Sequence, residues 1–289
     1  MSETYPFESH FFERDGIRLH YLDEGAGEPV VMVHGNPTWS FYYRRWVTAL
    51  KDRYRVIVPD HIGCGLSDKP GDDGYPYRLE RRAADLEALL DSLQVRGNIT
   101  LVAHDWGGMI AMHYAVSHPD RVRRIILLNT AAFHLPANKS IPMSLRLARS
   151  PIGALLVRGM NLFSLGLLAG GIKRRRLSPE ERAGYLRPYD SWKNRIAVHR
   201  FVQDIPLKPG DPSYATVTKV QDGLERLRDI PVLLFWGMKD FVFDADFLAE
   251  WERLLPHARV VRIEDAGHLV LEDAFDEIRE TSDEFLATT

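Results

Sequence analysis

The chain has 289 residues, of which 45% are hydrophobic and 27% are charged, and its formal net charge is −3. These values are ordinary for a globular protein and exclude a strongly basic nucleic-acid-binding protein. The single cysteine, Cys64, excludes an intrachain disulfide and a cysteine-rich metal site. The N-terminal segment lacks the basic start and apolar core of a signal peptide, so we expect a cytoplasmic protein.

Strand and helix patterns alternate along the N-terminal part of the chain. Asp15-Gly16 predicts a hairpin turn between the first two strands. Residues 29–33 form a short continuous apolar run, which is typical of a strand buried on both faces of a parallel sheet. We expect strands at 10–13, 17–22, 29–33, 55–58, 99–103 and 122–128, and helices at 40–51, 78–93 and 109–117.

The alternation stops after residue 131 and resumes at about residue 218. The stretch between these points is rich in Pro, Leu, Gly and Arg and has no evident strand. Because β-α-β alternation indicates a parallel sheet covered by helices, we predict an α/β core of residues 1–131 and 218–289. Residues 132–217 would form a helical cap inserted after the sixth strand. In the second part of the core we expect strands at 231–236 and 260–263 and helices at 245–255 and 273–286.

The segment Ile99–Gly108 carries the strongest chemical signal. A strand of largely β-branched residues runs into His-Asp-Trp-Gly-Gly, and a helix follows at once. The small residues Ala103 and Gly107 around Asp105 predict a nucleophile elbow with a carboxylate at its centre, although a helix N-cap is the alternative role for this Asp. With a reference pKa of about 3.9, a carboxylate is ionised at neutral pH and attacks an sp³ carbon without a base. The product is an alkyl ester on the enzyme.

His268 and Asp240 complete a candidate catalytic triad. Each follows a predicted strand, so both lie at the sheet edge that carries the nucleophile, in the chain order nucleophile, acid, histidine. The acid would hold the imidazole in one tautomer and stabilise its charged form. The preceding strand ends in Asn129, which carries no charge and therefore cannot supply the acid. Two nearby alternatives to Asp240 are Asp244 and Asp246.

Asn36 and Trp106 are candidate leaving-group ligands. Asn36 follows the strand at 29–33, and Trp106 follows the nucleophile. Their backbone N–H groups would form an oxyanion hole, and their side chains can each donate a hydrogen bond into the pocket. Core packing is the alternative role for Trp106. Two neutral donors opposite an attacking carboxylate suit an anionic leaving group.

These motifs resemble those of haloalkane dehalogenases and epoxide hydrolases. His34-Gly-Asn-Pro-Thr and His104-Asp-Trp-Gly-Gly look most like haloalkane dehalogenases, in which the Asn and Trp hold the departing halide. The resemblance covers essentially the whole chain and implies an α/β-hydrolase fold with a mostly parallel eight-stranded sheet. The set of five site residues is similar to that of the third dehalogenase subfamily. These five are Asn36, Asp105, Trp106, Asp240 and His268.

Three longer stretches narrow the resemblance. Residues 59–70, 128–136 and 201–210 are similar to the β-lactone decarboxylases of bacterial long-chain olefin synthesis. Those enzymes convert a cis-3,4-dialkyl-oxetan-2-one to a cis-olefin and CO₂. The resemblance implies a hydrophobic small-molecule substrate, and a complex with other olefin-pathway enzymes is a candidate partnership. No metal or organic cofactor is expected, because the sequence has no phosphate-binding Gly loop, no HExxH and no paired Cys motif.

The five site residues alone do not decide between a β-lactone and a haloalkane. We favour the β-lactone and keep haloalkane hydrolysis as the first alternative. Epoxide hydrolysis is a second alternative, because it usually needs cap tyrosines and three lie in the insertion. A non-catalytic lipid-binding or scaffold protein is disfavoured by the intact triad. The three cap tyrosines are Tyr185, Tyr189 and Tyr214.

The apolar stretch Pro151–Ile172 bears on substrate size. It has the length of a membrane span, but Arg158, Asn161 and recurrent Gly favour a cap helix packed on the core, and a lining for alkyl chains is a more specific interpretation. The basic run Lys173–Arg176 follows it directly. We expect this run to be a solvated face, and contact of residues 151–176 with an acidic membrane surface is the alternative.

Overall fold

An eight-stranded sheet lies at the centre of the computed structural model, which describes residues 4–137 and 139–289. The strand order is β1-β2-β4-β3-β5-β6-β7-β8, with the first two pairings antiparallel and the later ones parallel. The predicted mostly parallel sheet is therefore confirmed. The strands are β1 (His10–Arg14), β2 (Ile17–Glu24), β3 (Pro29–Val33), β4 (Arg55–Pro59), β5 (Ile99–Asp105), β6 (Val122–Thr130), β7 (Val232–Gly237) and β8 (Arg259–Ile263).

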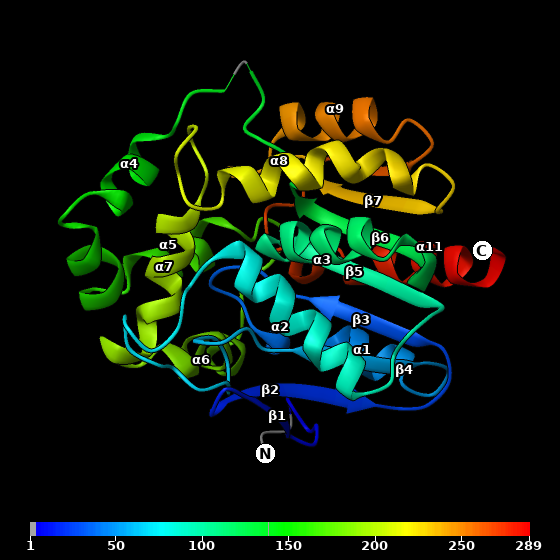
Figure 1. The fold of residues 1–289 in the computed structure, drawn as a ribbon, viewed down its shortest axis with the longest axis horizontal. Coiled ribbons are helices and arrows are strands. Elements are labelled where there is room, and N and C mark those ends of the chain that lie inside the picture. Colours follow the sequence, from blue (N-terminus) through cyan, green and yellow to red (C-terminus); the bar gives the residue numbers. More distant parts are fainter. Residues whose placement is uncertain (1–3, 138) are drawn as a thin grey trace.

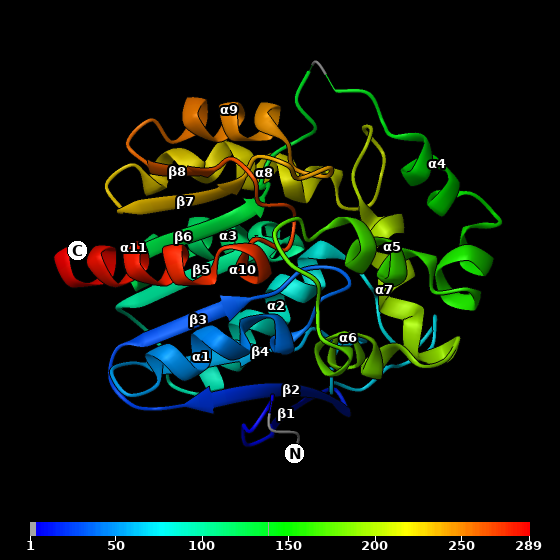
Figure 2. The same cartoon turned by 180° about the vertical axis from the view of Figure 1, so that it is seen from behind.

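Helices cover both faces of the sheet (Figures 1 and 2). One face carries α2 (Leu79–Ser92), α3 (Trp106–Ser117) and α8 (Tyr214–Gly223), and the other carries α1 (Arg44–Leu50) and α11 (Phe275–Thr288). Every residue of the central strands β5 and β7 is buried, as expected of parallel strands covered by helices on both faces. The remaining core helices are η1 (Ser40–Tyr43), η2 (Pro119–Arg121), η6 (Leu224–Leu227), α9 (Ala245–Leu254) and α10 (Val270–Asp273).

A helical cap follows β6 and lies beyond one end of the sheet (Figures 1 and 2). The predicted boundary between cap and core at 217/218 falls inside α8, which packs against α3 beside the sheet. The last residues of the predicted cap are therefore part of a helix that covers the core. The elements of the cap before α8 are α4 (Met143–Arg149), η3 (Leu155–Gly159), α5 (Leu162–Gly170), α6 (Pro179–Leu186), η4 (Arg187–Tyr189), η5 (Lys193–Arg195) and α7 (Ile196–Asp204).

The apolar stretch 151–172 does not form the single core-packed helix that we predicted. It consists of the π-helical turn η3 and the helix α5, separated by Asn161. The backbone of Asn161 has a φ of 55°, a left-handed conformation that cannot continue an α-helix. Ile152 and Leu155 are more than half exposed. In the described part of the chain, no helix has both the length and the apolar composition needed to cross a membrane.

Candidate active site

Asp105 lies at the junction of β5 and α3, as the elbow sequence predicted. Its φ of 53° is strained for a residue other than Gly, and it turns the chain sharply between strand and helix. The turn needs small neighbours. A β-carbon at Gly107 would lie 1.9 Å from the carbonyl oxygen of Val33, and one at Gly35 would lie 2.1 Å from Oδ1 of Asp105. These glycines let the β3 loop approach the carboxylate closely.

His268 connects the other two members of the predicted triad. Its Nδ1 lies 2.8 Å from Oδ2 of Asp240, and its Nε2 lies 3.7 Å from Oδ2 of Asp105. The first contact is a hydrogen bond, which assigns the proton to Nδ1 and leaves Nε2 of the neutral ring unprotonated. The second is longer than a hydrogen bond, so the facing oxygen of Asp105 is not tied to the imidazole. The three side chains meet from β5, the loop after β7 and the loop after β8.

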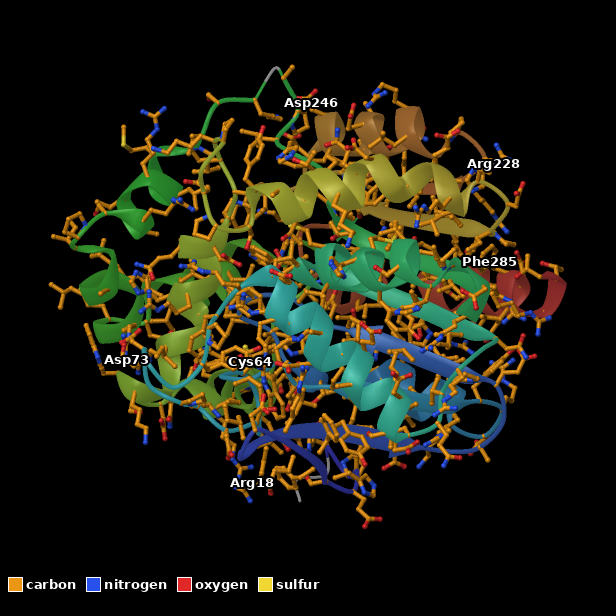
Figure 3. All side chains as sticks on the ribbon, in the orientation of Figure 1. Arg18, Cys64, Asp73, Arg228, Asp246 and Phe285 are labelled. Carbon is orange, nitrogen blue, oxygen red and sulfur yellow. The ribbon has the colours of Figure 1, made fainter. Side chains whose placement is uncertain are left out.

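The two alternatives for the triad acid lie elsewhere. Asp244 caps α9 by accepting a hydrogen bond from the backbone N–H of Asp246, and both carboxylates pair with Lys139. Figure 3 labels Asp246 at the rim of the molecule beside α9. Asp240, in contrast, is 4% exposed and bonded to the imidazole. The structure therefore brings Asp240 to His268, whereas Asp244 and Asp246 lie elsewhere.

Asn129 holds the loop that carries Asp240, a role that the sequence did not reveal. Its Oδ1 accepts a hydrogen bond of 2.8 Å from the backbone N–H of Gly237, and its Nδ2 donates to the carbonyl oxygens of Gly237 and Phe243. The amide thus bonds to both ends of the loop that leaves β7. Asn129 is fully buried, so water cannot replace these bonds.

One oxygen of Asp105 is held in the predicted oxyanion hole. The backbone N–H of Asn36 donates a 2.6 Å hydrogen bond to Oδ1, and the backbone N–H of Trp106 also bonds to the carboxylate. Burial raises the pKa of Asp105 above its usual value, although His268 and these two N–H groups oppose the shift. The side chain keeps 9% of its surface accessible. Oδ2, which faces His268, is therefore the oxygen available for attack.

The side chains of Asn36 and Trp106 differ from each other in their contacts. Nδ2 of Asn36 donates to the carbonyl oxygen of Val198 in cap helix α7, so one of its two amide protons does not point into the pocket as we predicted. The indole N–H of Trp106 has no acceptor among the described residues, and its ring packs on Phe201 at 5.2 Å between centroids. Trp106 is thus the free side-chain donor, and Asn36 keeps one amide proton for a ligand.

His104 positions the loop that carries the catalytic histidine. Its Nε2 donates to the carbonyl oxygen of His268 over 2.8 Å, and its ring lies 4.7 Å from the His268 ring. Burial, and then the neighbouring His268, hold the pKa of His104 well below its usual value, so this ring is neutral. Burial alone would lower the pKa of His268, but the charge of Asp240, its hydrogen bond and Asp105 together raise it.

A buried polar network lies behind the loop that carries Asn36. Asp60 accepts hydrogen bonds from His20 Nδ1 at 2.8 Å and from the backbone N–H of Ser40 at 2.7 Å. Burial would raise the pKa of Asp60, but His20, His34 and backbone donors lower it to about 2. His34 itself accepts from the backbone N–H of His61. In the described part of the chain, no three His, Cys, Asp or Glu side chains are arranged to bind a metal ion.

The cap tyrosines do not form the pair of ring-oxygen donors that an epoxide hydrolase needs. The hydroxyl of Tyr185 donates to Glu272, and that of Tyr189 donates to the carbonyl oxygen of Thr38. Tyr214 lies on α8 and stacks on His134 with centroids 4.1 Å apart. The two buried hydroxyls are therefore engaged in holding the cap on the core.

Comparison with known proteins agrees with this fold. Residues 28–275 match the family model described as alpha/beta hydrolase fold. The chain is 56% identical to a cis-3-alkyl-4-alkyloxetan-2-one decarboxylase of Shewanella oneidensis, over 94% of this chain and 86% of that protein. A protein of the same name from Xanthomonas campestris pv. campestris is 47% identical, with coverage of 90% and 89%.

Solved structures of haloalkane dehalogenases have the same fold as this chain. A haloalkane dehalogenase from Agrobacterium tumefaciens C58 superimposes with a TM-score of 0.86 at 26% identity, covering 97% of this chain and 96% of that one. The resemblance inferred from the site motifs is thereby confirmed over nearly the full length. The chain belongs to the α/β-hydrolase family, in the group that contains cis-3-alkyl-4-alkyloxetan-2-one decarboxylases and haloalkane dehalogenases.

Proposed function

We propose that this enzyme decarboxylates cis-3,4-dialkyl β-lactones to cis-olefins and CO₂, as a step of olefin biosynthesis. The proposal depends on one observation, that the two carboxylate oxygens of Asp105 have different contacts. Oδ1 accepts a hydrogen bond from the backbone N–H of Asn36, and Oδ2 lies free beside His268. The two relatives named as oxetanone decarboxylases select the lactone as the substrate class. We place the reaction in the cytoplasm, because a single cysteine allows no intrachain disulfide, as is usual for proteins of a reducing compartment.

Attack at the ring carbon that bears the ring oxygen gives a complete route. Oδ2 of Asp105 forms a bond to that carbon, and the ring C–O bond breaks to release a carboxylate. The new carboxylate can accept hydrogen bonds from the Trp106 indole and from the second amide proton of Asn36. The bond between the carboxylate and the neighbouring carbon then breaks, its electrons form the alkene, and Asp105 leaves as a carboxylate. No water is consumed.

The stereochemistry of this route agrees with a cis product. Attack inverts the configuration at the substituted carbon, and an anti fragmentation then follows. The two steps together convert a cis-lactone to a cis-olefin. Attack of Asp105 at the lactone carbonyl, which gives a mixed anhydride, is the other route. In that case the N–H groups of Asn36 and Trp106 would stabilise the tetrahedral oxyanion.

The charge state of His268 fits both routes. Its raised pKa means that the ring stays protonated to a higher pH than a free His, and the hydrogen bond to Asp240 stabilises that charge. An imidazolium 3.7 Å from Oδ2 stabilises the carboxylate that leaves during fragmentation. The water-free reaction therefore gives the histidine an electrostatic role, and it needs no general base.

Haloalkane hydrolysis remains a second candidate, supported by the overlay on a haloalkane dehalogenase with a TM-score of 0.86. In that reaction neutral His268 would activate water to hydrolyse the Asp105 ester. The two functions are separated by assaying one preparation on a synthetic cis-dialkyl β-lactone and on 1-bromohexane. We expect alkene and CO₂ in equal amounts from the lactone, at a turnover far above halide release. Rapid halide release without alkene would reject the proposal.

A further inference from the structure

The outer edge of the cap exposes a group of large apolar side chains. Their exposed fractions range from 44% for Leu147 to 74% for Met143. Figures 1 and 2 both place α4 and the segment that follows it at the edge of the molecule farthest from the C-terminus. We call this group the outer apolar face. Its members are Met143, Leu147, Ile152, Leu155, Met160, Leu162 and Trp192.

The members of this face lie close together. A β-carbon on Gly159 would meet Leu155 at 3.1 Å and the Trp192 ring at 3.6 Å, so these two side chains flank the same glycine. The guanidinium of Arg158 lies 4.8 Å from the centre of the Trp192 ring. A β-carbon on Gly153 would meet the backbone of Ala148, which brings the end of α4 against the same segment. Leu155, Trp192 and the end of α4 are therefore neighbours on one side of the cap.

The charges around the face are biased toward cations. The sequence from Arg121 to Pro179 contains no Asp or Glu. Arg146 and Lys193 are exposed beside the face, and neither has an ion-pair partner among the residues that the structure describes. Asp72, an acid that borders it, pairs with both Arg158 and Arg200.

The basic run 173–176 is not a main part of this surface. Arg174 pairs with Asp265 and Glu277, and Arg175 pairs with Glu181 and Glu272. These intramolecular pairs engage the two central guanidinium groups of the run. The membrane contact that we considered as the alternative for residues 151–176 is therefore better assigned to the seven side chains of the outer apolar face.

We propose that the outer apolar face docks on the surface of a bilayer that contains acidic phospholipid. Apolar side chains that include an exposed Trp match the acyl boundary and headgroup region, and unpaired Arg and Lys match anionic headgroups. The link between docking and the substrate rests on the proposed function. Dialkyl lactones and olefins partition into lipid, so docking brings the cap to the phase that holds them. A second copy of the chain is the competing occupant, but it would place the unpaired cations of two faces against each other.

Vesicle flotation of the full chain without substrate tests this proposal. We expect binding to vesicles of phosphatidylglycerol and phosphatidylcholine, weaker binding to phosphatidylcholine alone, and a decrease with salt. The double variant Leu155→Ser/Met160→Ser should bind at least about tenfold more weakly, and Lys193→Glu should weaken only the component that depends on acidic lipid. The control is Phe11→Ser, which removes a residue 46% exposed on β1 and should bind like the unmodified chain.

Three outcomes would overturn the proposal. These are no binding to either vesicle, equal loss of binding in the Phe11 control, and a dimer in light scattering that the Leu155/Met160 variant converts to monomer. Turnover of detergent-dispersed lactone is measured in parallel and should be the same in all variants. Because vesicle binding needs no substrate, failure of the proposed reaction and failure of membrane docking are distinguishable.

Discussion

Oδ2 of Asp105 and Nε2 of His268 face each other across 3.7 Å. This separation is too long for a hydrogen bond, so the carboxylate oxygen is free to form a bond to carbon. The other oxygen is held by the Asn36 N–H at 2.6 Å, which fixes the direction of attack. The arrangement allows two fates for the resulting ester, fragmentation or hydrolysis, and the following experiments separate them.

Removal of the nucleophile should abolish turnover. We expect Asp105→Ala to lower kcat by at least about 10⁴-fold on any substrate while the far-UV circular dichroism stays unchanged. Asp105→Asn keeps the shape without the charge, so any activity should grow with incubation as the amide is hydrolysed. Full activity of Asp105→Ala would show that another group attacks.

Replacement of the histidine should distinguish the two fates of the ester. With 1-bromohexane, His268→Phe should accumulate an alkyl ester on Asp105, visible as a mass increase of the intact protein, because water is no longer activated. With the lactone, fragmentation needs no base, so the same variant should retain measurable alkene formation and accumulate less adduct. Equal accumulation of a stable adduct from the lactone would contradict the water-free route.

The pH dependence should also differ between the two substrates. The raised pKa of Asp105 means that the carboxylate protonates at a higher pH than a free Asp, so both activities should fall in acid below that pKa. The raised pKa of His268 means that its neutral form is lost at a higher pH than in a free His. Steady-state halide release needs neutral His268, so its rate should already decline as the pH falls through the raised pKa of His268. The rate of alkene formation should not decline in that pH range. A decline of both rates at the same pH would argue for a shared hydrolytic step.

Asn129 provides a test of loop positioning. Asn129→Ala removes the hydrogen bonds to Gly237 and Phe243, so the loop with Asp240 should shift and kcat should fall by about 10²-fold with little change in KM. The pH profile should change with it, because the pKa of His268 depends on Asp240. Asn194→Ala, which removes an amide bonded to Asp190 at the surface of the cap, is the matched control. An unchanged profile in Asn129→Ala would assign Asn129 a purely structural role.

The sequence predicted the core and the site residues because local signals define them. The buried strands are rich in apolar residues, and catalytic groups follow them at the same edge of a parallel sheet. Asn129 was recognised only as an uncharged residue, since its partners Gly237 and Phe243 come from a distant loop. The amide of Asn36 turned toward Val198 for the same reason. The prediction of a single helix over residues 151–172 was wrong, because Asn161 adopts a left-handed backbone conformation that apolar periodicity does not reveal.

The central claim is that Asp105 is regenerated from the lactone without water. The most direct measurement is turnover of a synthetic cis-dialkyl β-lactone in H₂¹⁸O, followed by mass analysis of the peptide that contains Asp105. We predict many turnovers to alkene with an unlabelled Asp105, and ¹⁸O in the same peptide when 1-bromohexane replaces the lactone, because hydrolysis adds water oxygen to the carboxylate. Formation of a hydroxy acid from the lactone, together with ¹⁸O in Asp105, would contradict the account.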